Sequence, residues 1–156
     1  MAHWRFPNVI GVRGPVPWRP MTFRPDAVRG APAGGFTGVV DFRLARNAVV
    51  KEFKKGRLSK LDVCDAHPEL VRNAVHCGLP AGEECPICEE PGSIVHVTYV
   101  FGSRLPASGR CITSAGELAK MHRGTRELAA YVVEVCSACN WNHLIRTFPV
   151  GRRAGT

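Results

Sequence analysis

The stretch AAYVVEVCSACNWNHLIRTF, residues 129–148, contains the pattern that decides the fold. Its two halves are rich in β-branched and aromatic residues, which are typical of β-strands. Between them, Cys136 and Cys139 form a Cys-x-x-Cys turn. A turn with this spacing points both sulfur atoms at one spot and is typical of a metal-binding knuckle. A redox pair and two unrelated buried thiols are the alternatives.

A second Cys-x-x-Cys turn, CPIC, begins at Cys85. Together the two turns supply four thiolates at tetrahedral corners, the arrangement that structural zinc prefers. Acidic residues on both sides of CPIC disfavour a reactive thiolate, so this turn fits a redox dithiol poorly. We therefore predict one structural Zn²⁺ site, with no open coordination position, formed by Cys85, Cys88, Cys136 and Cys139. We expect His143 to lie beside this site rather than to ligate the metal.

The composition is that of a small globular protein. The chain has 156 residues, of which 45% are hydrophobic and 22% are charged. No apolar run approaches the roughly 18 residues that would span a bilayer, and the N-terminus lacks the apolar core of a signal peptide. The seven cysteines fit a reducing compartment, where thiols are metal-bound or free. We therefore expect a cytoplasmic protein without membrane association.

The first 37 residues differ from the rest of the chain. They are rich in proline, glycine and arginine, and proline resists both helices and central strands. We expect residues 1–37 to be a disordered basic extension or to lie upstream of the true translation start. Residues 38–150 are expected to form a single zinc-ribbon domain, and residues 151–156 a flexible tail.

Two helices are predicted before the first cysteine turn. We expect Thr37 to cap the first of them. The core-facing side chains of this helix recur at helical spacing, and they are Phe42, Ala45, Val49 and Phe53. Asp65 or His67 is expected to cap the second helix, which has Pro68 in its first turn and runs to Gly78.

Three strands and one more helix follow. β-Branched runs predict strands from Ser93 to Phe101, in AAYVVEVC and in NWNHLIRTF. Ser114 and Glu117 form a capping box for a helix that runs to about Leu128. The predicted fold class is therefore α+β, with an N-terminal helical pair packed on a zinc ribbon of short antiparallel strands that carries a helical insert.

The formal net charge of +8 is unevenly distributed. Residues 38–60 carry seven Lys or Arg against two acids, whereas residues 61–100 carry seven acids against one arginine. This asymmetry favours either nucleic acid or an acidic protein face as a partner of the first helix, and a solvated surface is the alternative. The candidate contact residues are Arg43, Arg46, Lys51, Lys54, Lys55 and Arg57.

Five segments together resemble one known family. They are VVDFRLARNAVV, DVCDAHPEL, CPIC, VHVTYVFG and YVVEVCSACNWNHLIRTF. The chain resembles, over about residues 39–150, a family of small actinobacterial proteins of unknown function. The resemblance implies metal ligands at the four cysteines of the two turns and brings no established activity. It includes the CDAH element, so Cys64 and His67 are candidates for a second metal site or for a structural role.

These observations favour a binding protein over an enzyme. The sequence contains no convincing phosphate-cradling loop or nucleophile elbow, and no small-molecule substrate is evident. We expect a non-enzymatic zinc-ribbon module associated with the transcription or translation machinery. Its partner would be a large protein or nucleoprotein complex, with nucleic acid as a candidate contact. The alternatives are a thiol-based redox sensor that releases zinc, and an enzyme that uses a second metal at Cys64 and His67.

Overall fold

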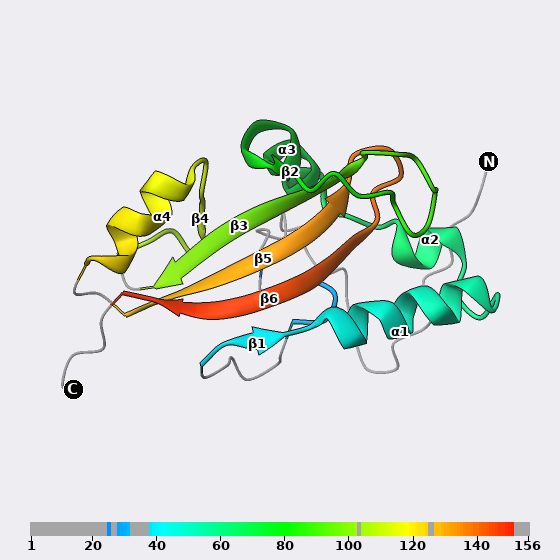
Figure 1. The fold of residues 1–156 in the computed structure, drawn as a ribbon, viewed down its shortest axis with the longest axis horizontal. Coiled ribbons are helices and arrows are strands. Elements are labelled where there is room, and N and C mark those ends of the chain that lie inside the picture. The colour runs from blue at the N-terminus through cyan, green and yellow to red at the C-terminus, as the bar shows by residue number, and fades with distance from the viewer. Residues whose placement is uncertain (1–24, 26–27, 32–37, 103, 125–126, 152–156) are drawn as a thin grey trace, which may run out of the picture.

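A computed structural model describes residues 25, 28–31, 38–102, 104–124 and 127–151 (Figure 1). The described elements form an α+β fold, as the sequence predicts. In chain order they are β1 (Val40–Asp41), α1 (Arg43–Lys54), α2 (Lys60–Val63), α3 (Pro68–Cys77), β2 (Leu79–Pro80), β3 (Ile94–Gly102), β4 (Arg110–Cys111), α4 (Ala115–His122), β5 (Leu128–Cys136) and β6 (Asn142–Val150).

The strands form one antiparallel sheet with the order β1-β6-β5-β3-β2, and β4 also pairs with β3. Its centre is made by β3, β5 and β6, which have nine residues each. β-Branched residues fill these strands, as expected for a pleated and largely buried surface. The β5–β6 register shifts by one residue between Val132 and Val133, so Ile145 forms an irregularity in β6.

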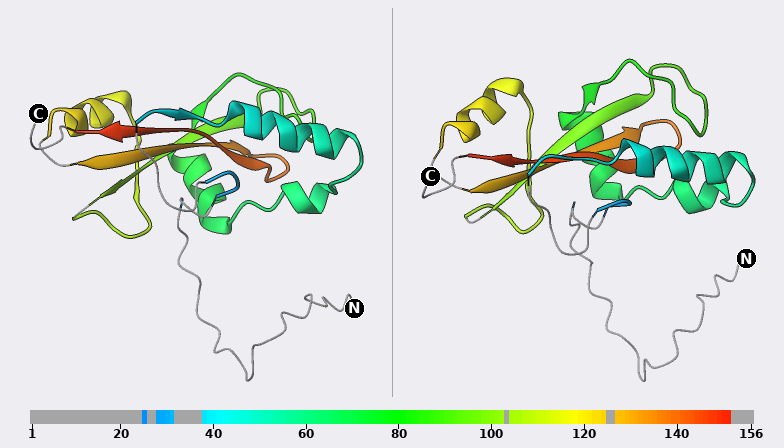
Figure 2. Two further views of the ribbon diagram at one scale, coloured as in Figure 1. Left: turned by 90° about the horizontal axis from the view of Figure 1, so that it is seen from below. Right: turned by 60° about the horizontal axis from the view of Figure 1, so that its bottom comes forward.

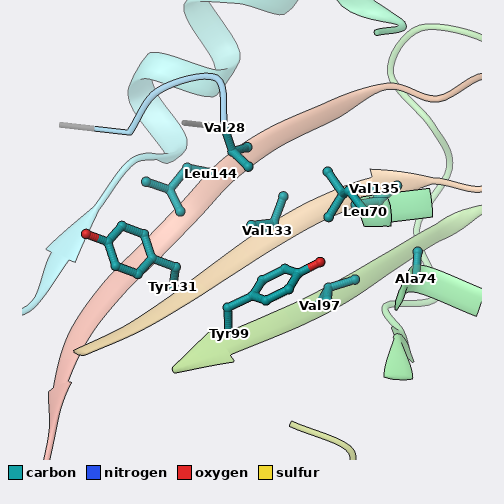
Figure 3. Close-up of a cluster of buried hydrophobic side chains, with 9 residues drawn as sticks. All are labelled: Val28, Leu70, Ala74, Val97, Tyr99, Tyr131, Val133, Val135 and Leu144. Atoms are coloured by element: carbon teal, nitrogen blue, oxygen red, sulfur yellow. The ribbon is translucent and has the colours of Figure 1, made fainter. Parts of the chain in front are cut away.

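Helices and loops cover both faces of the sheet (Figure 2). On one face, Leu70 and Ala74 of α3 pack with Val28 on the odd-numbered side chains of β3 and β5, such as Val97 and Val133 (Figure 3). The opposite face meets α1, the loop of residues 81–93 and α4. The second Cys-x-x-Cys turn lies at one end of the sheet, where β5 passes into β6.

The first helix begins later than predicted. Val40 and Asp41 pair with β6, and the N–H of Phe42 donates to the carbonyl of Ile145 at 2.8 Å. The helix starts only at Arg43, whose N–H donates to the Asp41 carboxylate at 2.8 Å. Residues 40–42 therefore pair with β6 rather than form the first helical turn that their spacing predicts. The expected cap, Thr37, lies outside the described residues.

The third helix agrees with its predicted signals. His67 Nδ1 accepts a hydrogen bond from the N–H of Glu69, Pro68 occupies the first turn, and Gly78 follows the last residue. A short helix that the sequence analysis did not predict, α2, precedes it and is held by a capping box of Ser59 and Asp62. Among the residues that the structure describes, no helix is both long and apolar enough to cross a membrane.

The fourth helix is shorter than predicted. Ser114 caps it by accepting the N–H of Glu117, but the helix ends at His122 rather than near Leu128. Leu128 instead opens β5 and pairs with Gly102 and Val150. Leu128, which the capping signal placed at the end of the helix, is therefore part of the sheet, because its backbone pairs with two neighbouring strands.

Residues 28–31 belong to the fold, which corrects the expectation of an extension that ends at residue 37. Val28 is buried in the core, and the carbonyl of Arg29 accepts the N–H of Leu144 at 2.9 Å. The Arg29 guanidinium also donates to the carbonyls of Val63 and Asn142. The rest of residues 1–37 apart from Pro25, and residues 152–156 of the expected tail, lie outside the described residues.

Gly30 is expected to be essential to the contact between residues 28–31 and β6. Its φ is +88°, and an added Cβ would lie 2.5 Å from Cε1 of the buried His143. We predict that Gly30→Ala lowers the free energy of unfolding by about 3 kcal/mol, through backbone strain and steric overlap. The control is Gly56→Ala, at φ +78° with no neighbour within 4 Å, which has strain alone and should lose about 1 kcal/mol. Equal losses in urea unfolding would show that the His143 contact contributes nothing.

Candidate metal centre

The structure brings together the four cysteines that the sequence groups. The sulfur atoms of Cys85, Cys88, Cys136 and Cys139 all lie within 4.8 Å of one another. The Cys85–Cys139 and Cys88–Cys136 sulfur pairs are each 3.7 Å apart. A regular tetrahedron with metal–sulfur bonds of about 2.3 Å has edges of about 3.8 Å. The spacing of the sulfur atoms therefore fits a four-coordinate metal ion.

In the first turn, a set of backbone hydrogen bonds fixes the position of Cys85. The N–H of Ile87 donates to Cys85 Sγ at 3.4 Å, and the N–H of Glu89 donates to the Cys85 carbonyl at 3.0 Å. The N–H of Cys85 donates to the carbonyl of Glu90 at 3.3 Å. Glu89, directly after the second cysteine of the turn, adopts a left-handed φ of 62°.

The second turn repeats every one of these features. The N–H of Ala138 donates to Cys136 Sγ at 3.3 Å, and the N–H of Asn140 donates to the Cys136 carbonyl at 3.1 Å. The N–H of Cys136 donates to the carbonyl of Trp141 at 2.9 Å, and Asn140 has a φ of 70°. Two turns with the same bonds and the same left-handed residue face each other across the sulfur group. N–H donors on the sulfur favour the thiolate, which is the form that binds a metal.

Strands β3 and β5 set the distance between the turns. Ile94 pairs with Cys136, so the first residue of β3 lies opposite the last residue of β5. Just outside this pair, the N–H of Ser137 donates to the carbonyl of Ser93 at 3.1 Å. The hydroxyl of Ser93 lies 3.2 Å from the sulfur of Cys136. The sheet thus fixes the second turn relative to the end of the loop that carries the first.

The thiols differ in their readiness to ionise. Burial opposes ionisation of Cys136, but its hydrogen bond with the Ser93 hydroxyl and those from nearby backbone N–H groups outweigh burial and lower the pKa of Cys136 to about 7. Burial raises the pKa of Cys85 to about 11 and also raises the pKa of Cys139. Cys136 therefore ionises more readily than Cys85 and Cys139, whose burial favours the protonated thiol. Metal binding should accordingly release protons.

A buried polar chain connects the centre to α1. Trp141 is fully buried and packs in one cluster with Cys85 and Cys136. Its indole N–H donates to Glu134 Oε1 at 2.9 Å, and the guanidinium of Arg46 binds the same oxygen at 2.8 Å. The sequence predicts Arg46 on a partner-contact face, but its guanidinium is bound to this carboxylate instead. The remaining candidate contact residues are exposed, and they are Arg43, Lys51, Lys54, Lys55 and Arg57.

His143 lies beside the centre and outside the group of sulfur ligands. Its ring stacks on Trp141, with centroids 6.1 Å apart, and its Nδ1 lies 2.6 Å from the carbonyl oxygen of Leu144. Burial lowers the pKa of His143 and so favours the uncharged form of the ring. The ring fills space next to the second turn.

Cys64 lies next to the centre, which its spacing in the sequence does not indicate. Its side chain packs against the same buried cluster as Cys139. The N–H of Ala66 donates to the carbonyl of Asn140 at 3.1 Å and fixes this segment on the second turn. His67 instead caps α3. Among the described residues, the four turn cysteines form the one group of three or more potential ligands, so Cys64 and His67 are not brought into a second such group.

We expect the metal-loaded chain to contain one divalent ion, held by all four turn cysteines. Cys136→Ser should lose the ion and unfold the domain, because such centres contribute on the order of 10 kcal/mol to folding. Cys111→Ser, which changes a cysteine outside the centre, is the matched control and should retain both ion and fold. Metal content per chain and circular dichroism provide the readouts. A Cys136→Ser protein with full metal content would contradict the assignment.

Comparison with known proteins agrees with the resemblance inferred from the sequence. Residues 36–156 match DUF5318, a family of unknown function. The uncharacterized protein Rv0049 of Mycobacterium tuberculosis (strain ATCC 25618 / H37Rv) is 38% identical over 112 residues, which are 72% of this chain and 81% of the relative. The uncharacterized protein Mb0050 of Mycobacterium bovis matches with the same values. No solved structure gives a significant match.

Proposed function

We propose that this chain, which belongs to the DUF5318 family of unknown function, is a non-enzymatic zinc-ribbon module. The observation that carries the proposal is the group of four sulfur atoms within 4.8 Å of one another. Four thiolates are typical ligands of structural zinc. They complete its tetrahedral coordination and leave no position for water or substrate. The zinc would therefore stabilise the fold rather than take part in a reaction.

The exposed basic residues support a phosphate-rich partner, such as the nucleoprotein complexes of transcription or translation. Lys51, Lys54 and Lys55 lie at the C-terminal end of α1 and are exposed. Part of their role is local, because cations at this end of a helix complement its dipole. Arg43 adds positive charge at the opposite end of the same helix, whereas Arg57 already pairs with Glu52 at 3.2 Å. A surface of this kind would bind nucleic acid through phosphates and without reading base sequence.

The experiment is a salt titration of binding to fluorescent RNA and DNA, using the zinc-loaded chain. If α1 contacts phosphates, log Kd should vary linearly with log salt concentration. Replacing Lys51, Lys54 and Lys55 with Gln should weaken binding and reduce the slope by about 2–3, since each contact contributes about 0.7–0.9.

The matched control replaces three exposed cations on other helices, Arg72, Lys120 and Arg123, with Gln. It removes the same total charge and should retain the original slope. Equal effects of the two triple variants would indicate attraction by net charge alone. Absent or salt-insensitive binding by the unmodified chain would overturn the nucleic-acid version and leave a protein partner.

A second candidate function, a redox sensor that releases zinc, is favoured by the position of Cys64. Its side chain packs against the same cluster as Cys139, and the hydrogen bond from Ala66 to Asn140 holds this segment on the second turn. Hydrogen peroxide could oxidise the sulfur of Cys64 or of Cys139 to a sulfenic acid, with release of water. The other sulfur would then form the disulfide and release a second water. Two thiols thereby lose two electrons, peroxide is reduced, and the centre loses one ligand.

The sensor hypothesis predicts that Cys64→Ser retains zinc but releases it several-fold more slowly under peroxide. A colorimetric zinc chelator would follow the release, and mass spectrometry would identify the Cys64–Cys139 disulfide. Cys111→Ser serves as the control and should release zinc at the original rate. Identical release from all three proteins would remove the sensor hypothesis without affecting the structural zinc.

A further inference from the structure

A polar cavity of about 220 Å³ lies on the α1 side of the sheet. Arg46, His96, Glu134 and Ile145 are the more buried residues of its lining, and Arg43, Asn47 and Glu83 are the exposed ones. Glu83 comes from the loop before the first cysteine turn, so the helix, this loop and the sheet all contribute to the walls of the cavity. None of these residues belongs to the sulfur group.

The more buried part of the cavity contains charge that the fold alone does not require. Glu134 is 1% exposed and lies in β5 among apolar residues. Its Oε1 binds both the guanidinium of Arg46 and the indole N–H of Trp141. A buried ion pair is weak support for stability, because apolar residues of similar volume often stabilise a core equally well. The pair is therefore a candidate for a role in binding, in addition to its contact with Trp141.

Two polar atoms in this part have no partner among the described residues. Arg46 Nε and His96 Nε2 are both buried and make no hydrogen bond. His96 lies directly opposite Glu134 in the β3–β5 register, so the two side chains are on the same face of the sheet. Unpaired buried polar atoms are unfavourable, so a molecule that pairs with both is favoured in this cavity.

The charges of the lining define the class of molecule. Arg43 and Arg46 provide two positive charges, and Glu83 and Glu134 provide two negative charges. An anion alone would face both carboxylates, and a cation alone would face both guanidinium groups. A compact zwitterion can direct a carboxylate to the arginines and an ammonium group to the glutamates. The cavity is also smaller than the roughly 300–1,000 Å³ of drug-sized sites, which favours a small ligand.

We propose that this cavity binds a small zwitterion of the α-amino-acid type. A carboxylate oxygen of the ligand would accept hydrogen bonds from Arg46 Nε and from His96. Its ammonium group would face Glu134 and Glu83. The site shares Arg43 with the basic surface of α1, but its ligand and its buried residues are not part of that surface.

The test is an NMR titration of the zinc-loaded full chain that follows the Nε–H resonance of Arg46. The probes are the free amino acids, with acetate, methylammonium and acetamide as the anionic, cationic and neutral comparisons. We expect at least one small amino acid to shift this resonance saturably, and the single-function probes to leave it unchanged at the same concentration. RNA binding is measured in a separate experiment. A failure of the amino-acid proposal can therefore be distinguished from a failure of the nucleic-acid proposal.

Variants at the exposed part of the cavity keep the test independent of folding. Arg43→Gln and Glu83→Gln change exposed side chains, and each should weaken amino-acid binding about tenfold, as expected for a hydrogen bond to a charged group. Arg72→Gln, on α3, should leave the affinity unchanged. The proposal is overturned if no amino acid binds at millimolar concentration, which would leave water as the occupant. It is also overturned if acetate binds equally well, or if all three variants behave alike.

Discussion

Four sulfur atoms from two distant turns must meet at one point, and much of the described fold depends on this constraint. The loop of residues 81–93 carries the first turn and exposes several acidic side chains, so it buries few apolar groups of its own. Cys85 and Ile87 are its buried apolar members, and both pack on the cluster around Trp141. A cation between the turns would neutralise the thiolates and fix this loop against the sheet.

The constraint extends from the centre into α1. Trp141 follows the second turn and shares its hydrogen-bond acceptor, Glu134 Oε1, with Arg46. A displacement of the second turn would therefore disturb an ion pair under the helix, and a change at Arg46 would reach the packing around the sulfur atoms. The metal centre and the basic helix are thus parts of one connected structure, although they are proposed to have different roles.

The sequence predicts those features whose causes are local. The caps of α3 and α4 were correctly identified, because Ser114 and His67 act on residues two or three positions away. The three long strands follow from their β-branched composition, and the ligand group follows from two identical cysteine spacings. Each of these signals can be recognised in one short segment of the chain.

The remaining features depend on contacts between distant segments. Residues 40–42 pair with β6 in place of a helical turn, and the guanidinium of Arg29 binds carbonyls of residues 63 and 142. Cys64 reaches the centre because Ala66 is hydrogen-bonded to Asn140. Arg46 leaves the exposed basic surface because a glutamate is buried beneath it. No spacing or composition indicates these partners, since each depends on how the sheet is assembled.

The two outer edges of the sheet have a consequence for self-association. Short segments cover both edges. The outer side of β3 pairs with the two-residue strands β2, which contains Pro80, and β4. The outer side of β6 pairs with the two-residue strand β1 and also bonds to the carbonyl of Arg29. Within the part of the chain that the structure describes, neither edge has a long row of unpaired N–H and C=O groups. Strand addition from a second copy would first have to displace these short segments. The fold therefore resists fibril growth through its sheet even though nearly the whole of β5 is hydrophobic.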